Sequence, residues 1–250
     1  MDNKPRRLLL IHGLGESALC FLSLRATWTQ QGWEVMAPDL PGYGQRHAQA
    51  PATFDEMVGE LAGCLTEPSV VLGHSMGGVL GLLLCVRYPE HIAAFINVEG
   101  NLSDADCTFS SLAIAQTEKH FLAKGFHDLL TSSLLNGLGQ GDARQGSYRE
   151  RMAGCNPLAF YRNSQELVQQ SVNGQLIEQF RDAIPGVPRV YMAGDTAGGV
   201  SQQSRQRLRQ AAIPLIVVPD SGHWPFLEAP DTFDYLLKPL LTGQGGYPLT

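Results

Sequence analysis

Charged side chains are scarce in this sequence of 250 residues, at 17% against about 25% in an ordinary soluble domain. Only four residues are lysines, and acidic residues exceed basic ones by 24 to 18, which gives a formal net charge of −6. A nucleic-acid-binding domain gathers positive charge on one face, so we expect no nucleic-acid partner. Hydrophobic residues make up 44% of the chain, which excludes an intrinsically disordered protein.

Long apolar runs are also missing. The longest, from Val79 to Val86, is far shorter than the ~20 residues that span a bilayer. Near the N-terminus, basic residues precede Leu8–Ile11, but this run is shorter than the roughly 7–15 apolar residues of a secretory signal. We therefore expect no membrane partner, and the short run is better interpreted as a strand.

Paired cysteines and metal-ligand spacings are absent as well. The five cysteines are an odd number, are widely spaced and contain no Cys-x-x-Cys pair, which favours reduced thiols in a cytoplasmic protein. The histidines show no His-x-x-x-His spacing, and the chain has neither a phosphate loop nor a dinucleotide-binding fingerprint. The sequence thus predicts no metal and no cofactor.

Short apolar runs alternate with longer helical patterns, which is typical of an α/β fold with a parallel sheet covered by helices. The expected strands are Arg7–His12, Glu34–Ala37, Ser69–Gly73, Ala93–Val98, Arg189–Ala193 and Pro214–Val218. The expected helices between them are Phe21–Gln31, Phe54–Thr66, Gly77–Tyr88, Ser201–Ala211 and Pro230–Leu241. This pattern predicts a sheet of about six mostly parallel strands.

The alternation breaks once, between Val98 and Arg189, where amphipathic helical stretches are interrupted by glycines such as Gly125. Compact domains rarely contain a structureless loop of this length. We interpret residues 100–187 as a helical lid inserted into a core formed by residues 1–99 and 188–250. Its aromatic residues should mostly pack the lid helices, with one or two lining a pocket.

The strongest motif is Gly73-His74-Ser75-Met76-Gly77, which lies between an expected strand and an expected helix. This is the G-x-S-x-G nucleophile elbow in its required context, a turn so tight that only small residues fit beside it. The serine hydroxyl then lies near a helix N-terminus, where free N–H groups favour a developing oxyanion.

A serine nucleophile needs a base, and His223 is the best-placed of the seven histidines. It follows the last expected strand, so it lies at the same carboxyl edge of the sheet as Ser75. Gly222 before it allows the backbone to bend and the imidazole to reach inward.

Together these motifs resemble the α/β-hydrolase superfamily, over essentially the whole chain. The resemblance rests on His12-Gly13-Leu14-Gly15 after the first strand, Asp39-Leu40-Pro41-Gly42 after the second, the elbow, and Ser221-Gly222-His223. It implies that the backbone N–H groups of Leu14 and Met76 form the oxyanion hole. His12 is expected to brace its loop, and Asp39 to hold its turn.

The acid of the expected catalytic triad has more than one candidate. Many relatives carry it in a Gly-x-x-Asp turn after the penultimate strand, where this chain has Ala197, with Asp195 two residues earlier. Other members of the superfamily take it from the strand that follows the elbow helix, and the matching residue here is Glu99. We predict Glu99, with Asp195 as the alternative acid, because a carboxylate ending a buried strand needs a strong partner such as an imidazole. Asp220 is a further candidate, although its position favours a turn.

The sequence therefore predicts a cofactor-independent serine hydrolase with Ser75, His223 and Glu99 as its triad. Its expected substrate is a small or medium carboxylic ester, or a thioester, cleaved through an acyl-enzyme. One alternative keeps the triad for C–C bond hydrolysis, lactone opening or lyase chemistry. The other alternative is a non-catalytic protein that binds a ligand on a hydrolase scaffold.

Overall fold

The computed structural model describes residues 6–172, 175–182, 186–196 and 199–242. In this part of the chain, six strands form a single parallel sheet in the order β2-β1-β3-β4-β5-β6. The strands are β1 (Arg7–Ile11), β2 (Glu34–Met36), β3 (Ser69–His74), β4 (Ile92–Val98), β5 (Arg189–Gly194) and β6 (Leu215–Val218). The six-stranded parallel sheet predicted from the sequence is confirmed, with each strand boundary within one residue of its expected position.

Burial explains why the strands could be recognised so closely. The central strands β1 and β3 are apolar along nearly their whole length, and almost all of their residues are buried. A strand covered by helices on both faces cannot alternate between polar and apolar residues. Its continuous hydrophobicity is therefore the expected signature.

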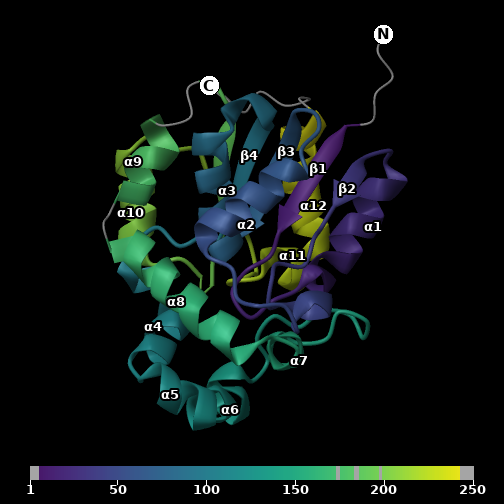
Figure 1. Cartoon of the computed structure of the whole chain (residues 1–250). Coiled ribbons are helices and arrows are strands. Elements are labelled where there is room, and N and C mark those ends of the chain that lie inside the picture. The colour runs from purple at the N-terminus through teal and green to yellow at the C-terminus, as the bar shows by residue number, and fades with distance from the viewer. Residues whose placement is uncertain (1–5, 173–174, 183–185, 197–198, 243–250) are drawn as a thin grey trace.

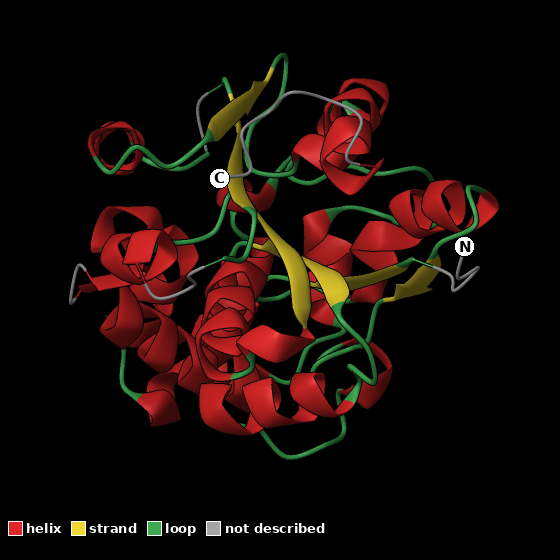
Figure 2. Cartoon of the chain, turned by 90° about the horizontal axis from the view of Figure 1, so that it is seen from above, coloured by secondary structure: helices red, strands yellow, loops and turns green. Residues whose placement is uncertain are grey.

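Helices cover both faces of this sheet (Figures 1 and 2). Helices α2 (Phe54–Gly63) and α3 (Met76–Arg87) pack together on one face, and α1 (Leu22–Gln30) and α12 (Pro230–Thr242) lie on the other. The Trp28 indole donates a hydrogen bond to Asp234 Oδ1 at 3.1 Å, which ties α1 to α12. The remaining helices of the core are α10 (Gln202–Gln210) and the short α11 (Pro225–Glu228).

Two expected helices differ from the structure at their ends. The first begins with a 3₁₀ turn, Ala18–Phe21, because the Ser17 side chain accepts the N–H of Leu19 and starts the turn there. The second ends at Gly63 rather than Thr66, because its last turn tightens and Cys64 bonds to the carbonyl three residues back. Local capping set both boundaries.

Helices also make up the described segment between β4 and β5, and Figure 1 shows most of them beyond the carboxyl ends of the strands, while the last lies beside α3. They are α4 (Thr108–Ile114), α5 (Glu118–His120), a π-helical turn (Phe121–Gly125), α6 (Phe126–Thr131), α7 (Tyr148–Ala153), α8 (Pro157–Val172) and α9 (Gln175–Asp182). Gly125 does not interrupt this segment, contrary to the sequence expectation, because the π-helical turn continues directly into α6. A β-carbon there would lie 2.2 Å from Gln116 Oε1, so a larger residue would require the Gln116 side chain to move.

Helix α8 joins this segment to the core. The Asn156 N–H that precedes it bonds to the Gly42 carbonyl at 2.8 Å, and Tyr43 Oη donates to Asn163 Oδ1 at 2.8 Å. The Phe54 N–H at the start of α2 bonds to Glu166 Oε2 at 2.9 Å. These bonds hold α8 against the loop after β2 and against α2.

None of the described helices is both long enough and apolar enough to cross a bilayer.

Candidate active site

Ser75 occupies a sharp turn between β3 and α3, with φ 54° and ψ −122°. The turn is possible because its neighbours lack side chains. A β-carbon on Gly73 would lie 2.1 Å from the Gly77 carbonyl oxygen, and one on Gly77 would lie 2.1 Å from the carbonyl oxygen of Ile11. The G-x-S-x-G motif therefore has the steric role expected of a nucleophile elbow.

The N–H groups of Leu14 and Met76 have no hydrogen-bond partner among the described residues. Met76 is the first residue of α3, so its N–H is one of the free donors that every helix N-terminus carries. Leu14 belongs to the loop after β1, and β1 pairs directly with β3. Both loops flank Ser75, and Leu14 and Ser75 line one cavity. Met76, the residue after Ser75, is buried.

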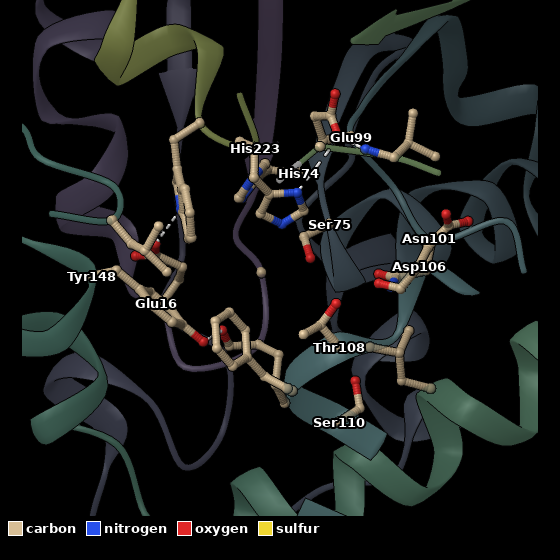
Figure 3. A pocket seen from close by; sticks show the side chains of 18 of the residues that line it. Glu16, His74, Ser75, Glu99, Asn101, Asp106, Thr108, Ser110, Tyr148 and His223 are labelled. Atoms are coloured by element: carbon tan, nitrogen blue, oxygen red, sulfur yellow. Dashed lines mark hydrogen bonds and ion pairs between the residues drawn. The ribbon is translucent and has the colours of Figure 1, made fainter. Parts of the chain in front are cut away.

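His223 contacts the carboxylate of Glu99, with 3.5 Å between Nδ1 and Oε2. Figure 3 shows the imidazole between Glu99 and Ser75. The Ser75 hydroxyl forms no hydrogen bond with a described residue. His223 thus has a carboxylate at one ring nitrogen and the serine on its other side.

The Glu99 side chain is completely buried. The residue directly follows β4 and has φ 51°, a backbone conformation that is rare for a residue with a side chain. Its Oε1 accepts the N–H of Gly194 at 2.8 Å, and its Oε2 accepts the N–H of Val200. The Arg205 guanidinium lies 4.0 Å from Oε1. These donors compensate for the loss of water around a buried carboxylate.

The other acid candidates lie elsewhere. Asp195 is exposed and accepts the N–H of Ser221 at 3.3 Å, so it holds the turn before His223 without an ion pair to the imidazole. Asp220 is also exposed, in a turn with φ 56°. Ala197, which occupies the usual position of the acid, lies outside the described residues.

His12 and Asp39 have the bracing positions that the sequence predicted. His12 Nδ1 bonds to the Gly13 carbonyl at 2.9 Å, and Nε2 accepts the N–H of Leu40 at 3.0 Å. Asp39 accepts the N–H groups of Ala18 at 2.7 Å and Gln45 at 2.9 Å. Burial lowers the pKa of His12, which favours the neutral ring that this pair of bonds requires.

His74, inside the elbow motif, supports the histidine loop. Its Nε2 lies 2.8 Å from the carbonyl oxygen of His223, and the two imidazole rings lie 4.9 Å apart. Burial lowers the pKa of His74 well below its usual value, and its Nδ1 has no partner among the described residues. The ring is therefore neutral and donates from Nε2 to the loop that carries His223.

A cavity of about 250 Å³ lies in front of Ser75. Its described walls contain no lysine or arginine, and their apolar residues include Phe109, Leu138 and Leu167 from the segment between β4 and β5. Figure 3 shows Thr108 and Ser110 on the side of the pocket opposite His223. Of the aromatic residues in that segment, Phe109 and Tyr148 line the cavity, as the sequence predicted for one or two of them.

Sequence reasoning missed a buried ion pair beside this cavity. Glu16 follows the His-Gly loop, and its carboxylate meets Arg151 of α7, with Nη2 to Oε1 at 3.1 Å, while Trp224 Nε1 donates to Oε1 at 2.7 Å. Burial raises the pKa of Glu16, and the Arg151 guanidinium acts against this. A charged residue directly after His-Gly-x-Gly was the available signal, but its partner is 135 residues away in sequence.

Among the residues that the structure describes, no three histidine, cysteine or acidic side chains are grouped as metal ligands would be.

Comparison with known proteins agrees with this geometry. A sequence model described as the Alpha/beta hydrolase family matches residues 8–234. The chain is 24% identical over 242 residues to the mouse sn-1-specific diacylglycerol lipase ABHD11, covering 90% of this chain and 78% of that lipase. It is 25% identical over 258 residues to the pimeloyl-[acyl-carrier protein] methyl ester esterase of Aromatoleum aromaticum, covering 96% and 100%.

Among solved structures, the enol-lactonase from Burkholderia xenovorans LB400 superposes with a TM-score of 0.74 at 18% identity. That match covers 96% of this chain and 90% of the lactonase. Because the family model matches most of the chain, the protein belongs to the α/β-hydrolase family. It is a hydrolytic enzyme of that family, in agreement with the resemblance drawn from its motifs.

Proposed function

We propose that the protein is a serine hydrolase that cleaves small, uncharged carboxylic esters through an acyl-enzyme. The observation that carries this proposal is the position of the His223 imidazole between the Glu99 carboxylate and Ser75 (Figure 3). Nδ1 lies 3.5 Å from the carboxylate, and all three residues line the cavity. Glu99 is the proposed acid, and Asp195 is not, because Asp195 is exposed and bonds to Ser221.

In the proposed reaction, His223 takes the Ser75 proton as Oγ attacks the ester carbonyl carbon. The carbonyl oxygen becomes an oxyanion that accepts hydrogen bonds from the N–H groups of Leu14 and Met76. The imidazolium then protonates the leaving alcohol, and a water activated by the same ring hydrolyses the acyl-enzyme. Glu99 fixes the ring orientation and stabilises its positive charge.

The cavity supports the choice of substrate. An apolar cavity of 150 Å³ holds a molecule of benzene, so about 250 Å³ suits a substrate portion of about ten non-hydrogen atoms. The described walls offer no cation to a carboxylate or phosphate, while Glu16 and Asp106 are among the lining residues. Both features favour a neutral ester over an anionic substrate.

We further propose that residues 100–187 act as a cap on a core formed by residues 1–99 and 188–250, because ten residues of this segment, among them Phe109 and Tyr148, line the cavity in front of Ser75. A cytoplasmic location remains a prediction from the cysteine pattern.

The direct test is to treat the folded protein with a fluorophosphonate and to assay p-nitrophenyl acetate and butyrate. We expect one phosphonyl group on Ser75 and steady ester turnover, both abolished in Ser75→Ala. A protein that converts a lactone or a diketone but no p-nitrophenyl ester would instead support the alternative reactions. Tight ligand binding without labelling of Ser75 would contradict an enzymatic serine.

A further inference from the structure

Helix α7 contacts the loop that follows β1 at two points. The Tyr148 phenol donates a hydrogen bond to the Leu14 carbonyl oxygen at 3.0 Å. One turn later, Arg151 forms a bidentate ion pair with Glu16, in which Nη2 lies 3.1 Å from Oε1 and Nε binds Oε2. All four residues are buried.

Gly15, between the two contacts, shows how closely the loop and the helix approach. Its φ is +70°, and a β-carbon would lie 2.8 Å from Tyr148 Oη and 3.1 Å from Phe160 Cε2. Any residue with a side chain would both strain the backbone and push α7 away. The loop is therefore shaped to receive this helix.

The same carboxylate also reaches the histidine loop. Trp224, which follows His223, donates to Glu16 Oε1 at 2.7 Å. Its indole ring packs against the Tyr148 ring at 5.0 Å and stands perpendicular to the His223 ring at 4.8 Å. Glu16 thus joins three segments that are far apart in sequence: the loop with Leu14, helix α7 and the loop with His223.

Arg151 has no donor left for a substrate. Besides the two bonds to Glu16, its Nη1 donates to the carbonyls of Gln145 and Gly146, and its Nη2 donates to the carbonyl of Gly139. A guanidinium saturated in this way holds backbone in place.

We propose that Tyr148 and Arg151 are positioning residues that hold the oxyanion hole in its reactive geometry. This inference rests on the proposed function, in which the Leu14 N–H is one of the two oxyanion donors. The carbonyl and the N–H of Leu14 are attached on either side of one α-carbon. When Tyr148 fixes the carbonyl and Arg151 fixes the neighbouring Glu16, the N–H is held in one direction before substrate arrives. An oxyanion donor is effective only when it is preorganised in this way.

The decisive variant is Tyr148→Phe, which removes one hydroxyl and keeps the ring that packs on Trp224. We expect kcat to fall about tenfold with KM changed less than twofold, because a loosened donor affects the transition state more than the bound ester. The matched control is Tyr161→Phe. Tyr161 is also buried in the proposed cap and also donates to a backbone carbonyl, that of Gln116 at 2.9 Å, but it does not line the cavity. Its kinetics should be unchanged.

Two inhibitors separate positioning from general damage to the fold. Ser75 adds to a trifluoromethyl ketone, its proton passes to His223, and the ketone oxygen becomes an oxyanion. An unreactive amide of the same shape forms none. Tyr148→Phe should weaken binding of the ketone by the factor lost in kcat and leave binding of the amide unchanged. Equal losses for the two inhibitors, or the same behaviour in Tyr148→Phe and Tyr161→Phe, would overturn the proposal.

Arg151→Lys tests the second contact, because a lysine keeps the charge and cannot form the bidentate bond. We expect Arg151→Lys to lose less affinity for the ketone than Arg151→Met loses, while both variants bind the amide as tightly as the unaltered protein does. Should both Arg151 variants fail to fold, Tyr148→Phe still decides the question.

A further measurement, the rate at which a fluorophosphonate labels Ser75, can be made without knowing the substrate. If the unaltered protein is not labelled, the proposed function is wrong. If the unaltered protein and all variants are labelled at equal rates, only the positioning role is wrong.

Discussion

At the scale of single residues, two side chains occupy backbone conformations that residues with a β-carbon rarely adopt. Ser75 follows β3 with φ 54°, and Glu99 follows β4 with φ 51°. The two strands are neighbours, and the Ser75 N–H bonds to the Val98 carbonyl at 3.0 Å. Such strain tends to persist where function needs it, so the pair supports an active site at this edge of the sheet.

The assignment of the acid can be tested by a pair of isosteric changes. In Glu99→Gln the side chain keeps its shape and loses its charge, so the His223 imidazolium is no longer stabilised. We expect kcat on a p-nitrophenyl ester to fall by about 10³- to 10⁴-fold.

Asp195→Asn provides the matched control, because it makes the same chemical change in an exposed side chain. Its kcat should stay within twofold of the unaltered protein. The opposite result, with Glu99→Gln active and Asp195→Asn inactive, would show that the catalytic acid is Asp195 in the turn after β5.

At the scale of elements, the elbow depends on how closely α3 approaches β1. Gly77 has no room for a methyl group, since its β-carbon would lie 2.1 Å from a backbone oxygen of Ile11. Gly77→Ala should lower the free energy of unfolding by about 3 kcal/mol, because β1 or α3 must shift. Urea denaturation followed by circular dichroism measures this.

Gly59→Ala is the corresponding control in α2. Gly59 is exposed, and a β-carbon there meets no atom within 4 Å. The substitution should raise the free energy of unfolding by about 0.5–1 kcal/mol, because alanine restricts the unfolded chain and favours the helix. Equal effects at Gly59 and Gly77 would show that helix propensity, and not steric contact, controls the elbow.

The segment between β4 and β5 has two parts with different attachments. Helices α7 and α8 bond to the core through Tyr148, Arg151, Asn156 and Asn163. Helix α4 contacts chiefly α8, and it contributes Thr108, Phe109 and Ser110 to the cavity. The first part therefore positions the site, and the second shapes the space that a substrate fills.

At the scale of the whole molecule, two buried histidines should make stability depend on pH. Burial lowers the pKa of both His12 and His74 in the folded protein. Below about pH 6.5 the unfolded chain binds protons that the folded protein does not, so stability falls as pH falls. From pH 7 to about pH 5.5, both histidines therefore lower the free energy of unfolding as pH falls.

Urea denaturation at several pH values checks this expectation. His74→Gln, which cannot be protonated in this range, should reduce the pH dependence, whatever it does to stability at pH 7. A free energy of unfolding that stays constant or rises from pH 7 to about pH 5.5 would contradict the neutral, buried state of both rings.

Much of the fold could be predicted from the sequence because its signals are local. The strands β1 and β3 are continuous apolar runs, and the elbow is a five-residue pattern at a strand–helix junction. Helix ends were less accurate, as at Gly63, since a tightened turn decides where that helix ends.

Of the proposed site, Ser75 and His223 were found from local motifs, while the choice of Glu99 needed an argument about burial. Helix α7 was beyond sequence reasoning. Tyr148 and Arg151 look like ordinary helical residues, and their partners Leu14 and Glu16 are 134 and 135 residues away.

The scarcity of charge shows the same division. By itself the sequence determined the parallel sheet, the elbow and the family, because apolar periodicity and glycine positions constrain the backbone locally. Only the tertiary structure decided how the few buried charges are used: Glu99 beside His223, and Glu16 between Arg151 and Trp224. A buried charge is stable only next to its partner, and the partner's position is a property of the folded chain.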